Sequence, residues 1–573
     1  MESKSCAITP KSLPTQNPRA VLTKALFYRI IGVRECLRGL LCLRLELKEV
    51  IVFILSQANG KDSRGRARKQ KQEERNDMKR KQTTISGILV LILLCISCSK
   101  GTSGSGTNSS DINGVTNGNE TVNISQPAAT ETEEKKLDAL PELDYDGTTI
   151  VIHTRGDSVN EIYTDGITGN IVNDIIYERN TLVEDRLNIK IEVFEAEGWQ
   201  KYDQSVTSLV ASIYANDSAF DLIAGWSARI PSLSMQGCLH NLSELEYLDM
   251  DSPWWNQTCR TELQLGDHVY FLTGDASMSF LTAMSVFAVN QKVAVDNGVE
   301  NLYDVVKEHR WTIDYVNSLT RNFYTDLNGD GEIDPKDGFG LTTSSVNDVD
   351  GYLQGFHATM SVRGEDGYPQ FSPDREFLGS IAEKVYELTW GNPGCLTNTG
   401  DTTDLDCFKE DRALLAVTRI GDVTSRFADM ESDYGVLPYP LFNEFQDTYG
   451  TRVQDGVSLW CVPIDAHDAE MSGAVLEAFG SQSYRTVTPE YFDVVLKNRY
   501  SRDPETAEMM DLVKNSVWIT FDSLYNESIG YPWHYLRYMM MAKTNNFSSF
   551  WAACENAYVA NYEKTIGQLK ELD

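Results

Sequence analysis

Apolar residues recur with two alternating periods along residues 148–224. Short runs rich in β-branched residues alternate as strands do, and between them apolar residues return every three or four positions, as on one face of a helix. The elements predicted in this way are a strand at 148–153, a helix at 172–187, a strand at 189–193, a helix at 206–213 and a strand at 220–224. This order predicts a parallel sheet with helices on both of its faces.

The residues after these strands are candidates for binding, because ligands of such folds lie at the carboxyl ends of strands. Asp157 follows the first strand, and Trp226 and Arg229 stand in the loop after the third. Trp226 is the first candidate because an indole offers a large flat apolar face to a ligand, and Arg229 and Asp157 can supply polar partners beside it. The alternative is that Trp226 packs in the core.

A secretion signal is predicted at residues 78–98, which read MKRKQTTISGILVLILLCISC. Three cations precede an apolar run that is short for a membrane span, and a small residue stands before Cys98. The ending resembles the lipobox of bacterial lipoproteins, whose cysteine is acylated, although Cys95 stands where leucine is usual. Cys98 is thus the expected lipid anchor, and an uncleaved membrane anchor is the alternative.

A signal that starts at Met78 leaves residues 1–77 without a role in an exported protein. This segment is basic and has no recurring hydrophobic period, and the codons of residues 72–74 can contain a purine-rich ribosome-binding sequence. We expect it to be a leader that lies upstream of the true start, with a disordered basic extension as the alternative. Residues 98–140 are poor in apolar side chains and are predicted to be a flexible tether.

The net charge of the chain is −32, and the acidic excess lies beyond the signal. Residues 1–97 carry 19 Lys and Arg against 8 Asp and Glu, whereas the remainder carries 32 against 75. A phosphate-binding surface needs a basic face, so no nucleic acid is expected as a partner. An acidic surface is also repelled by anionic lipid, so the acylated Cys98 would hold the protein to the membrane.

Beyond residue 268 the chain carries a series of motifs that are weak one by one and specific in their order. In chain order they are YFLTGD at 270–275, an apolar run that ends in Asn290, RWTID at 310–314, the segment 408–422, YGVLPYP at 434–440, QDGVSLW at 454–460 and TPEYF at 488–492. This order resembles that of family 1 extracellular solute-binding proteins, the substrate-capturing lipoproteins of ABC importers. The resemblance covers residues 145–530.

The resemblance implies an α/β protein with the two-lobed, type 2 fold of periplasmic binding proteins, in which each lobe is a mixed sheet flanked by helices and the ligand cleft lies between the lobes. The implied division is lobe 1 at 145–283 and 455–520, lobe 2 at 284–440 and 521–573, and a hinge crossing at 441–454. The family also implies a sugar or oligosaccharide ligand, ABC permease subunits as partners, a monomer, and a place on the outer face of the bacterial cytoplasmic membrane. A peptide or another solute stays an alternative ligand.

Four further candidates for the ligand site come from the implied hinge and second-lobe loops. They are Asp275, Trp390, Arg419 and Asp422. The segment that holds the last two resembles the family's turn into a buried strand whose exit loop faces the cleft. Trp254 and Trp255 are expected to pack on a helix instead.

Residues 326–337 read DLNGDGEIDPKD and resemble the calcium loop of an EF-hand. The expected ligands of a structural calcium ion are Asp326, Asn328, Asp330, the carbonyl of Glu332, Asp334 and Asp337. The last position is Asp337 rather than the longer, bidentate glutamate, so weak binding is predicted. The alternative is a polar turn that binds no ion.

Six cysteines follow Cys98, namely Cys238, Cys259, Cys395, Cys407, Cys461 and Cys554. No two of these six form a Cys-x-x-Cys pair, so zinc is not expected. Cys395 and Cys407 enclose a short polar loop and are the pair for which a disulfide is predicted. Six free thiols are the alternative.

The sequence lacks the common catalytic motifs. It has seven histidines, neither a His-Glu-x-x-His nor a Gly-x-Ser-x-Gly pattern, and no glycine-rich phosphate loop. No pair of carboxylates stands in a recognisable glycosidase context. The resemblance then implies a protein that binds its ligand without chemistry and without a catalytic cofactor, and an envelope-anchored carbohydrate-active hydrolase is the alternative.

Overall fold

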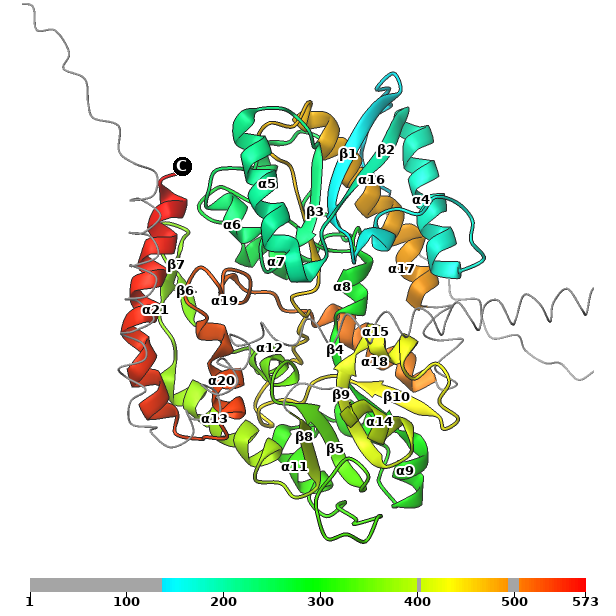
Figure 1. The fold of residues 1–573 in the computed structure, drawn as a ribbon, viewed down its shortest axis with the longest axis vertical. Helices are drawn as coiled ribbons and strands as arrows, with labels where there is room; N and C mark the ends of the chain where they lie inside the picture. The colour runs from blue at the N-terminus through cyan, green and yellow to red at the C-terminus, as the bar shows by residue number, and fades with distance from the viewer. Residues whose placement is uncertain (1–136, 399–402, 493–503, 573) are drawn as a thin grey trace, which may run out of the picture. The chain divides into compact units, whose positions relative to one another are not determined.

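The computed structural model describes residues 137–398, 403–492 and 504–572, which belong to one compact unit, Thr132–Asp573. The predicted leader, signal peptide, lipid anchor and most of the tether lie outside the described residues. Two sheets form the framework of the unit, and helices flank both (Figure 1). The α/β class predicted from the sequence is thus confirmed. Among the described residues, no helix is long and apolar enough to cross a membrane.

The first sheet has the strand order β11-β3-β1-β2. Its strands are β1 (Thr148–Arg155), β2 (Ile189–Ala196), β3 (Leu222–Trp226) and β11 (Ser458–Cys461). β1 pairs in parallel with β2 and β3, as the apolar pattern predicts, and β11 returns from far along the chain to pair antiparallel with β3. This pairing sets Trp226 opposite Ser458, so Trp226 ends the strand and does not stand in the loop after it.

The second sheet has the strand order β10-β4-β9-β5-β8. Its strands are β4 (Ser285–Asn290), β5 (Phe339–Ser344), β8 (Cys395–Asn398), β9 (Ala413–Arg419) and β10 (Tyr434–Leu437). β5 is parallel to β8 and β9, whereas β4 is antiparallel to β9 and β10. Almost every residue of β4, β5, β9 and β10 is buried, which is the pattern of a sheet covered on both faces. A separate hairpin pairs β6 (Ser361–Arg363) with β7 (Pro369–Phe371).

Helices fill the connections between strands, and half of them begin at an Asn, Asp or Thr whose side chain accepts from the first turn. They are α4 (Ile171–Leu187), α5 (Tyr202–Ala215), α6 (Pro231–Ser234), α7 (Gln257–Glu262), α8 (Met278–Thr282), α9 (Gln291–Asp296), α10 (Leu302–Lys307), α11 (Ile313–Thr320), α12 (Gly351–Gly355), α13 (Arg375–Thr389), α14 (Thr403–Lys409), α15 (Ile420–Ser425), α16 (Ala469–Arg485), α17 (Val487–Glu490), α18 (Pro504–Asn515), α19 (Phe521–Leu524), α20 (Tyr535–Met541) and α21 (Phe547–Lys570). The pair α4 and α16 packs beside the first sheet, and the pair α11 and α13 beside the second (Figure 1).

Two of the segments that cross from one sheet to the other run side by side. The amide of Ser285 donates to the carbonyl of Arg452 at 2.8 Å, and the amide of Gln454 donates to the carbonyl of Ala283 at 2.9 Å. The buried carboxylate of Glu161 also joins these segments, because it accepts from the Ser279 amide at 2.5 Å and from the Ser458 hydroxyl. These two crossings are therefore linked to each other by backbone hydrogen bonds and by one shared carboxylate.

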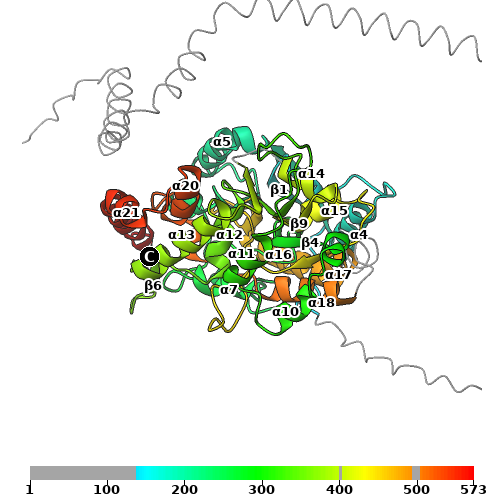
Figure 2. The same ribbon diagram turned by 90° about the horizontal axis from the view of Figure 1, so that it is seen from below.

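The C-terminal third departs from the implied division between lobes. Residues 504–515, expected in the first lobe, form α18, which packs on β10 and α10 beside the second sheet. A buried pair of hydroxyl groups, Tyr303 and Thr506, 2.7 Å apart, joins α18 to α10. Farther on, α21 lies along α13, α20 and β7, as both views show (Figures 1 and 2).

Trp254 and Trp255 pack on a helix, as the sequence predicted. Both are buried, and their indole N–H groups donate to the Glu477 carboxylate of α16 at 3.2 and 3.3 Å. Burial raises the pKa of Glu477 to about 7, from an ordinary value of 4.5, in spite of these two hydrogen bonds. The Glu477 carboxyl therefore changes charge near neutral pH in the folded protein.

This shift predicts a pH-dependent stability that Glu477→Gln removes. The folded state holds the Glu477 proton more tightly than the unfolded state, so the folded protein is stabilised as the pH falls from about 8 to about 5. The free energy of unfolding of the wild type, relative to that of the variant, should rise by roughly 2–3 kcal/mol over this range. Urea unfolding of both proteins at the two pH values measures it. A constant difference would show that Glu477 is ionised throughout.

The predicted disulfide between Cys395 and Cys407 is not formed. All six cysteines in the described part of the chain are free, and five of them are buried. The Cys407 thiol donates to the carbonyl of Pro335 at 2.9 Å, and the Cys395 sulfur lies 3.5 Å from the Thr397 hydroxyl, so the two thiols are engaged in different places. The alternative of six free thiols is the one that the structure supports.

Candidate functional site

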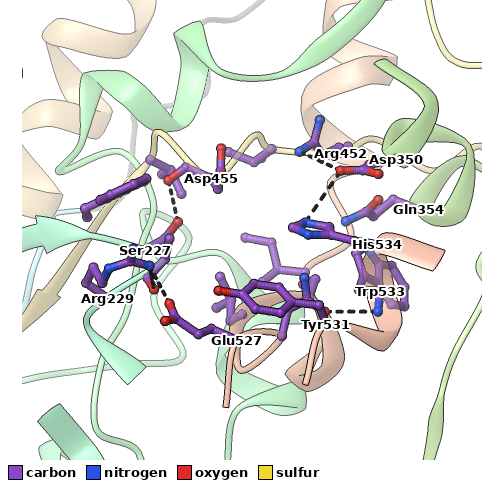
Figure 3. Close-up of a pocket in the computed structure, with 18 of the residues that line it drawn as sticks. Ser227, Arg229, Asp350, Gln354, Arg452, Asp455, Glu527, Tyr531, Trp533 and His534 are labelled. Carbon is purple, nitrogen blue, oxygen red and sulfur yellow. Dashed lines mark hydrogen bonds and ion pairs between the residues drawn. The ribbon is translucent and has the colours of Figure 1, made fainter. Parts of the chain in front are cut away.

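A cavity lies where the carboxyl end of β3 faces the elements that follow β5 (Figure 3). It holds about 140 Å³ within its walls and about 820 Å³ of empty space when its open mouth is counted. One wall comes from residues 226–229, at the end of β3, and another from η5 (Asp348–Asp350) with α12. The other walls come from the crossing at 452–457 and from residues 518–534. The cavity thus joins both sheets and one of the crossings between them.

Trp226 and Arg229 form the wall on the side of the first sheet. The Trp226 ring is half-buried, packs edge-on against Tyr202, and has the Arg229 guanidinium 4.9 Å from its centre. Arg229 is held in turn by Asp203 and by Glu527, each at 2.5 Å. Burial lowers the pKa of Arg229, but the hydrogen bond to Asp203 and the charge of Glu527 outweigh it, so the net shift is upward. This wall therefore presents an indole beside a cation that is fully engaged.

Asp350 is the centre of the opposite wall. Its carboxylate is completely buried and is surrounded by Arg537, by Arg452 at 3.6 Å and by His534 at 3.7 Å (Figure 3). Arg452 also donates to the carbonyl of Asn347 at 2.8 Å. Burial lowers the pKa of His534 to about 4, against the pull of Asp350, so the imidazole is neutral at ordinary pH.

Residues 518–534 supply the remaining wall, which is rich in aromatic side chains. Trp518 is half-buried, Trp533 is buried, and Tyr531 stacks on His534 with ring centres 5.5 Å apart. Tyr531 has a φ of 65°, a left-handed conformation that its amide supports by donating to the carbonyl of Asn526 at 2.6 Å. The chain is thus turned sharply to set three aromatic rings around one space.

No family model and no curated protein matches the chain, whereas many solved structures do. The maltose/maltodextrin-binding domain MalE from Bdellovibrio bacteriovorus bound to maltotriose has a TM-score of 0.46 and 14% identity, over 73% of this chain and 100% of that one. An ABC substrate-binding protein from Listeria monocytogenes in complex with cycloalternan has a TM-score of 0.47 and 14% identity, over 74% and 100%. The galacto-N-biose-/lacto-N-biose I-binding protein of the ABC transporter from Bifidobacterium longum, in complex with lacto-N-biose, has a TM-score of 0.47 and 12% identity, over 74% and 98%.

The structure brings two of the seven predicted ligand-binding residues, Trp226 and Arg229, to the cavity. Asp157 does not line the cavity. It pairs with Arg155, whose guanidinium stands 5.6 Å from the centre of the Trp226 ring. Arg419 and Asp422 do not line the cavity: they pair with each other at 2.8 Å, and Arg419 also reaches Gln454.

Asp275 and Trp390 lie elsewhere and support the fold. The buried Asp275 carboxylate accepts from Thr488 at 2.9 Å and pairs with Lys514 at 3.1 Å, which links the first lobe to α17 and α18. Trp390 ends α13 and donates its indole N–H to the carbonyl of Met540 at 3.0 Å. Neither side chain reaches the cavity.

The predicted calcium loop is exposed, and its side chains are turned onto the loop itself. Asp326 accepts from the amides of Gly329 and Gly331, and Asp334 is engaged by Lys336 at 2.9 Å. Asp337 is buried and accepts from the Leu327 amide at 3.2 Å. In the described parts of the chain, no three His, Cys, Asp and Glu side chains are grouped to hold a metal ion. As placed, Asp334 is paired with Lys336, and calcium binding stays a prediction that requires Asp334 to leave Lys336.

Calcium added after chelation is expected to raise the melting temperature of the wild type and not that of Asp326→Ala, which lacks the carboxylate at the first position of the loop. An ion that binds only the folded state stabilises it by mass action, by roughly 2.7 kcal/mol at a hundred times the dissociation constant. A thermal titration of both proteins with calcium measures the effect. Identical curves for the two proteins would identify residues 326–337 as a polar turn without an ion.

Proposed function

We propose that this protein is an extracytoplasmic receptor that binds a sugar or oligosaccharide in the cavity between its two sheets and passes it intact to an ABC importer. The observation that carries the proposal is the cavity itself, whose aromatic and polar walls come from both lobes and from one of the crossings that join them. A ligand that contacts both lobes favours the arrangement in which they are closed around it.

The chemistry of the walls favours a sugar. Trp226, Trp518 and Tyr531 offer flat apolar faces of the kind on which pyranose C–H groups stack, and the polar groups between them are fixed by ion pairs. A peptide recognised through its backbone would need an extended groove or a free strand edge, and among the described lining residues only Trp226 belongs to a strand. The sugar class is therefore preferred over a peptide.

The proposal includes no catalysis. Hydrolysis of a glycoside needs one protonated carboxyl as general acid and a second carboxylate as nucleophile or base. Three acids line the cavity: Asp350 and Glu527 are both engaged in ion pairs with arginine, and Asp455 stands exposed at its mouth. We infer that these carboxylates position a ligand and do not exchange protons with it.

The receptor is proposed to start at Met78 and to be anchored by an acylated Cys98 on the outer face of the cytoplasmic membrane. The support is the order of cations, apolar run, small residue and cysteine in residues 78–98. Mass spectrometry of the natively expressed protein is expected to find no peptide from residues 1–70 and a lipid-modified N-terminal peptide at Cys98. Peptides from residues 1–70 would reject this start.

A thermal-shift screen of the full chain against oligosaccharides, peptides and small solutes tests the proposed ligand class. We expect stabilisation by at least one oligosaccharide and by no peptide, because ligand binding to the folded state raises the melting temperature. Stabilisation by peptides alone would support the receptor role and contradict the proposed sugar ligand. Consumption of a stabilising oligosaccharide during the assay would favour the hydrolase.

A further inference from the structure

The charged side chains that line the cavity differ in what they leave open, because the cations are committed to partners whereas carboxylate oxygens are left without one. Two lining side chains are arginines, and both are committed: Arg229 to Asp203 and Glu527, and Arg452 to Asp350 and the carbonyl of Asn347. The imidazole of His534 adds no positive charge at ordinary pH, because burial holds its pKa at about 4. No lysine lines the cavity. A ligand anion would therefore find no cation that is free to receive it.

Two buried acceptors on neighbouring turns have no partner in the described protein. They are Oδ1 of Asp350 and Oε1 of Gln354, and both residues face the cavity from η5 and α12 (Figure 3). A buried polar atom without a partner is costly, so such atoms mark places where a ligand supplies the missing group. An amide can turn to offer its N–H groups instead, but an ionised carboxylate can only accept. Asp350 is thus suited to a ligand that donates a hydrogen bond.

Asp455 adds a second open carboxylate at the mouth of the cavity. Its side chain is exposed and has no hydrogen bond or ion pair within residues 137–398, 403–492 and 504–572. The indole N–H of the buried Trp533 also has no partner in the same described parts. A hydroxyl group meets both demands, since it donates to a carboxylate and accepts from an indole.

Resting on the proposed function, we infer that the cavity selects uncharged or amine-bearing sugars and rejects sugars that carry a carboxylate. A uronic acid placed there would set its charge against Asp350 and Asp455 with no free cation to offset them, and this lowers affinity. A neutral sugar offers hydroxyl donors to both acceptors, and an amino group offers charged donors, which form stronger hydrogen bonds.

Calorimetric titration of the full chain with matched trisaccharides tests this inference. The probes are neutral trisaccharides of glucose and of galactose, the triuronic acid of galactose, and the trimer of glucosamine. We expect the better neutral probe or the glucosamine trimer to bind at least tenfold more tightly than the triuronic acid. Equal or tighter binding of the triuronic acid would overturn the inference and leave the proposed function intact. If none of the probes binds and no other sugar does in the screen, the proposed function fails and the inference fails with it.

Two variants locate the selectivity in the cavity. Asp455→Asn, at an exposed position, is expected to leave the fold intact. The ratio between the dissociation constant of the triuronic acid and that of the best-bound probe should fall at least threefold. Asp304→Asn, an equally exposed change of one charge on α10, is the control and should leave the preference as it is. An Asp455→Asn preference identical to that of the wild type would remove Asp455 from the selective wall and contradict the inference.

Discussion

Replacing Trp226 by alanine is expected to weaken sugar binding at least a hundredfold while the protein stays folded. Trp226 is the large aromatic wall on the side of the first sheet, and it also holds Arg229, whose guanidinium lies 4.9 Å from its ring centre. Losing the stacking face and the fixed cation together removes roughly 2.7 kcal/mol or more of binding free energy, as at other aromatic hot spots. Calorimetric titration of the wild type and the variant with the same sugar gives the ratio.

Trp390→Ala is the matched control for this experiment. Trp390 is the other tryptophan that the sequence suggested for the site, and the structure places it at the end of α13, away from the cavity. Its removal should leave the dissociation constant within about twofold of the wild-type value. A Trp226→Ala protein that binds normally, or a Trp390→Ala protein that does not bind, would mean that the ligand lies elsewhere.

Trp460→Ala is expected to lower the free energy of unfolding by about 3–5 kcal/mol, the usual cost of emptying a fully buried tryptophan site. Trp460 stands in β11, the strand that returns to the first sheet after the second crossing. Its ring packs on Phe479 of α16, and its indole N–H donates to the Ser277 hydroxyl at 2.8 Å. The side chain of Trp460 thus contacts α16 and the start of the first crossing from its place in β11.

Chemical denaturation of Trp460→Ala beside Trp199→Ala measures this effect. Trp199 is 58% exposed, so its replacement should change the free energy of unfolding by less than about 0.5 kcal/mol. Comparable losses in the two variants would contradict the placement of β11 in the core of the first lobe.

The sequence predicted the first sheet well because its elements carry complete hydrophobic periods. The predicted helix at 172–187 is α4 (Ile171–Leu187), and the predicted strands at 148–153 and 189–193 are β1 and β2. The predicted end of β3 lies two residues before the observed end, because the sequence of one strand does not show which strand pairs with it. Pairing with β11, more than 200 residues later, is what extends β3 to Trp226.

The candidate site was predicted only where it follows a strand. Trp226 and Arg229 were found in this way, whereas Asp350, Arg452 and the aromatic residues of 518–534 were not, since they lie in irregular segments without a period. A signal was present in the last of these, which gathers two tryptophans, three tyrosines and a histidine between residues 518 and 535. Asp275 and Trp390 were misplaced because sequence position alone does not show that Lys514 and Met540 bind them.

Recovery of the ligand after binding is the most direct test of a receptor that takes up a sugar intact. The full chain is incubated with a stabilising oligosaccharide at equimolar concentration, the complex is isolated by gel filtration, and the sugar released on unfolding is identified by mass spectrometry. We predict one equivalent of unaltered oligosaccharide for each protein chain. Shortened sugar in the complex or in the medium would contradict the account and identify the protein as a hydrolase.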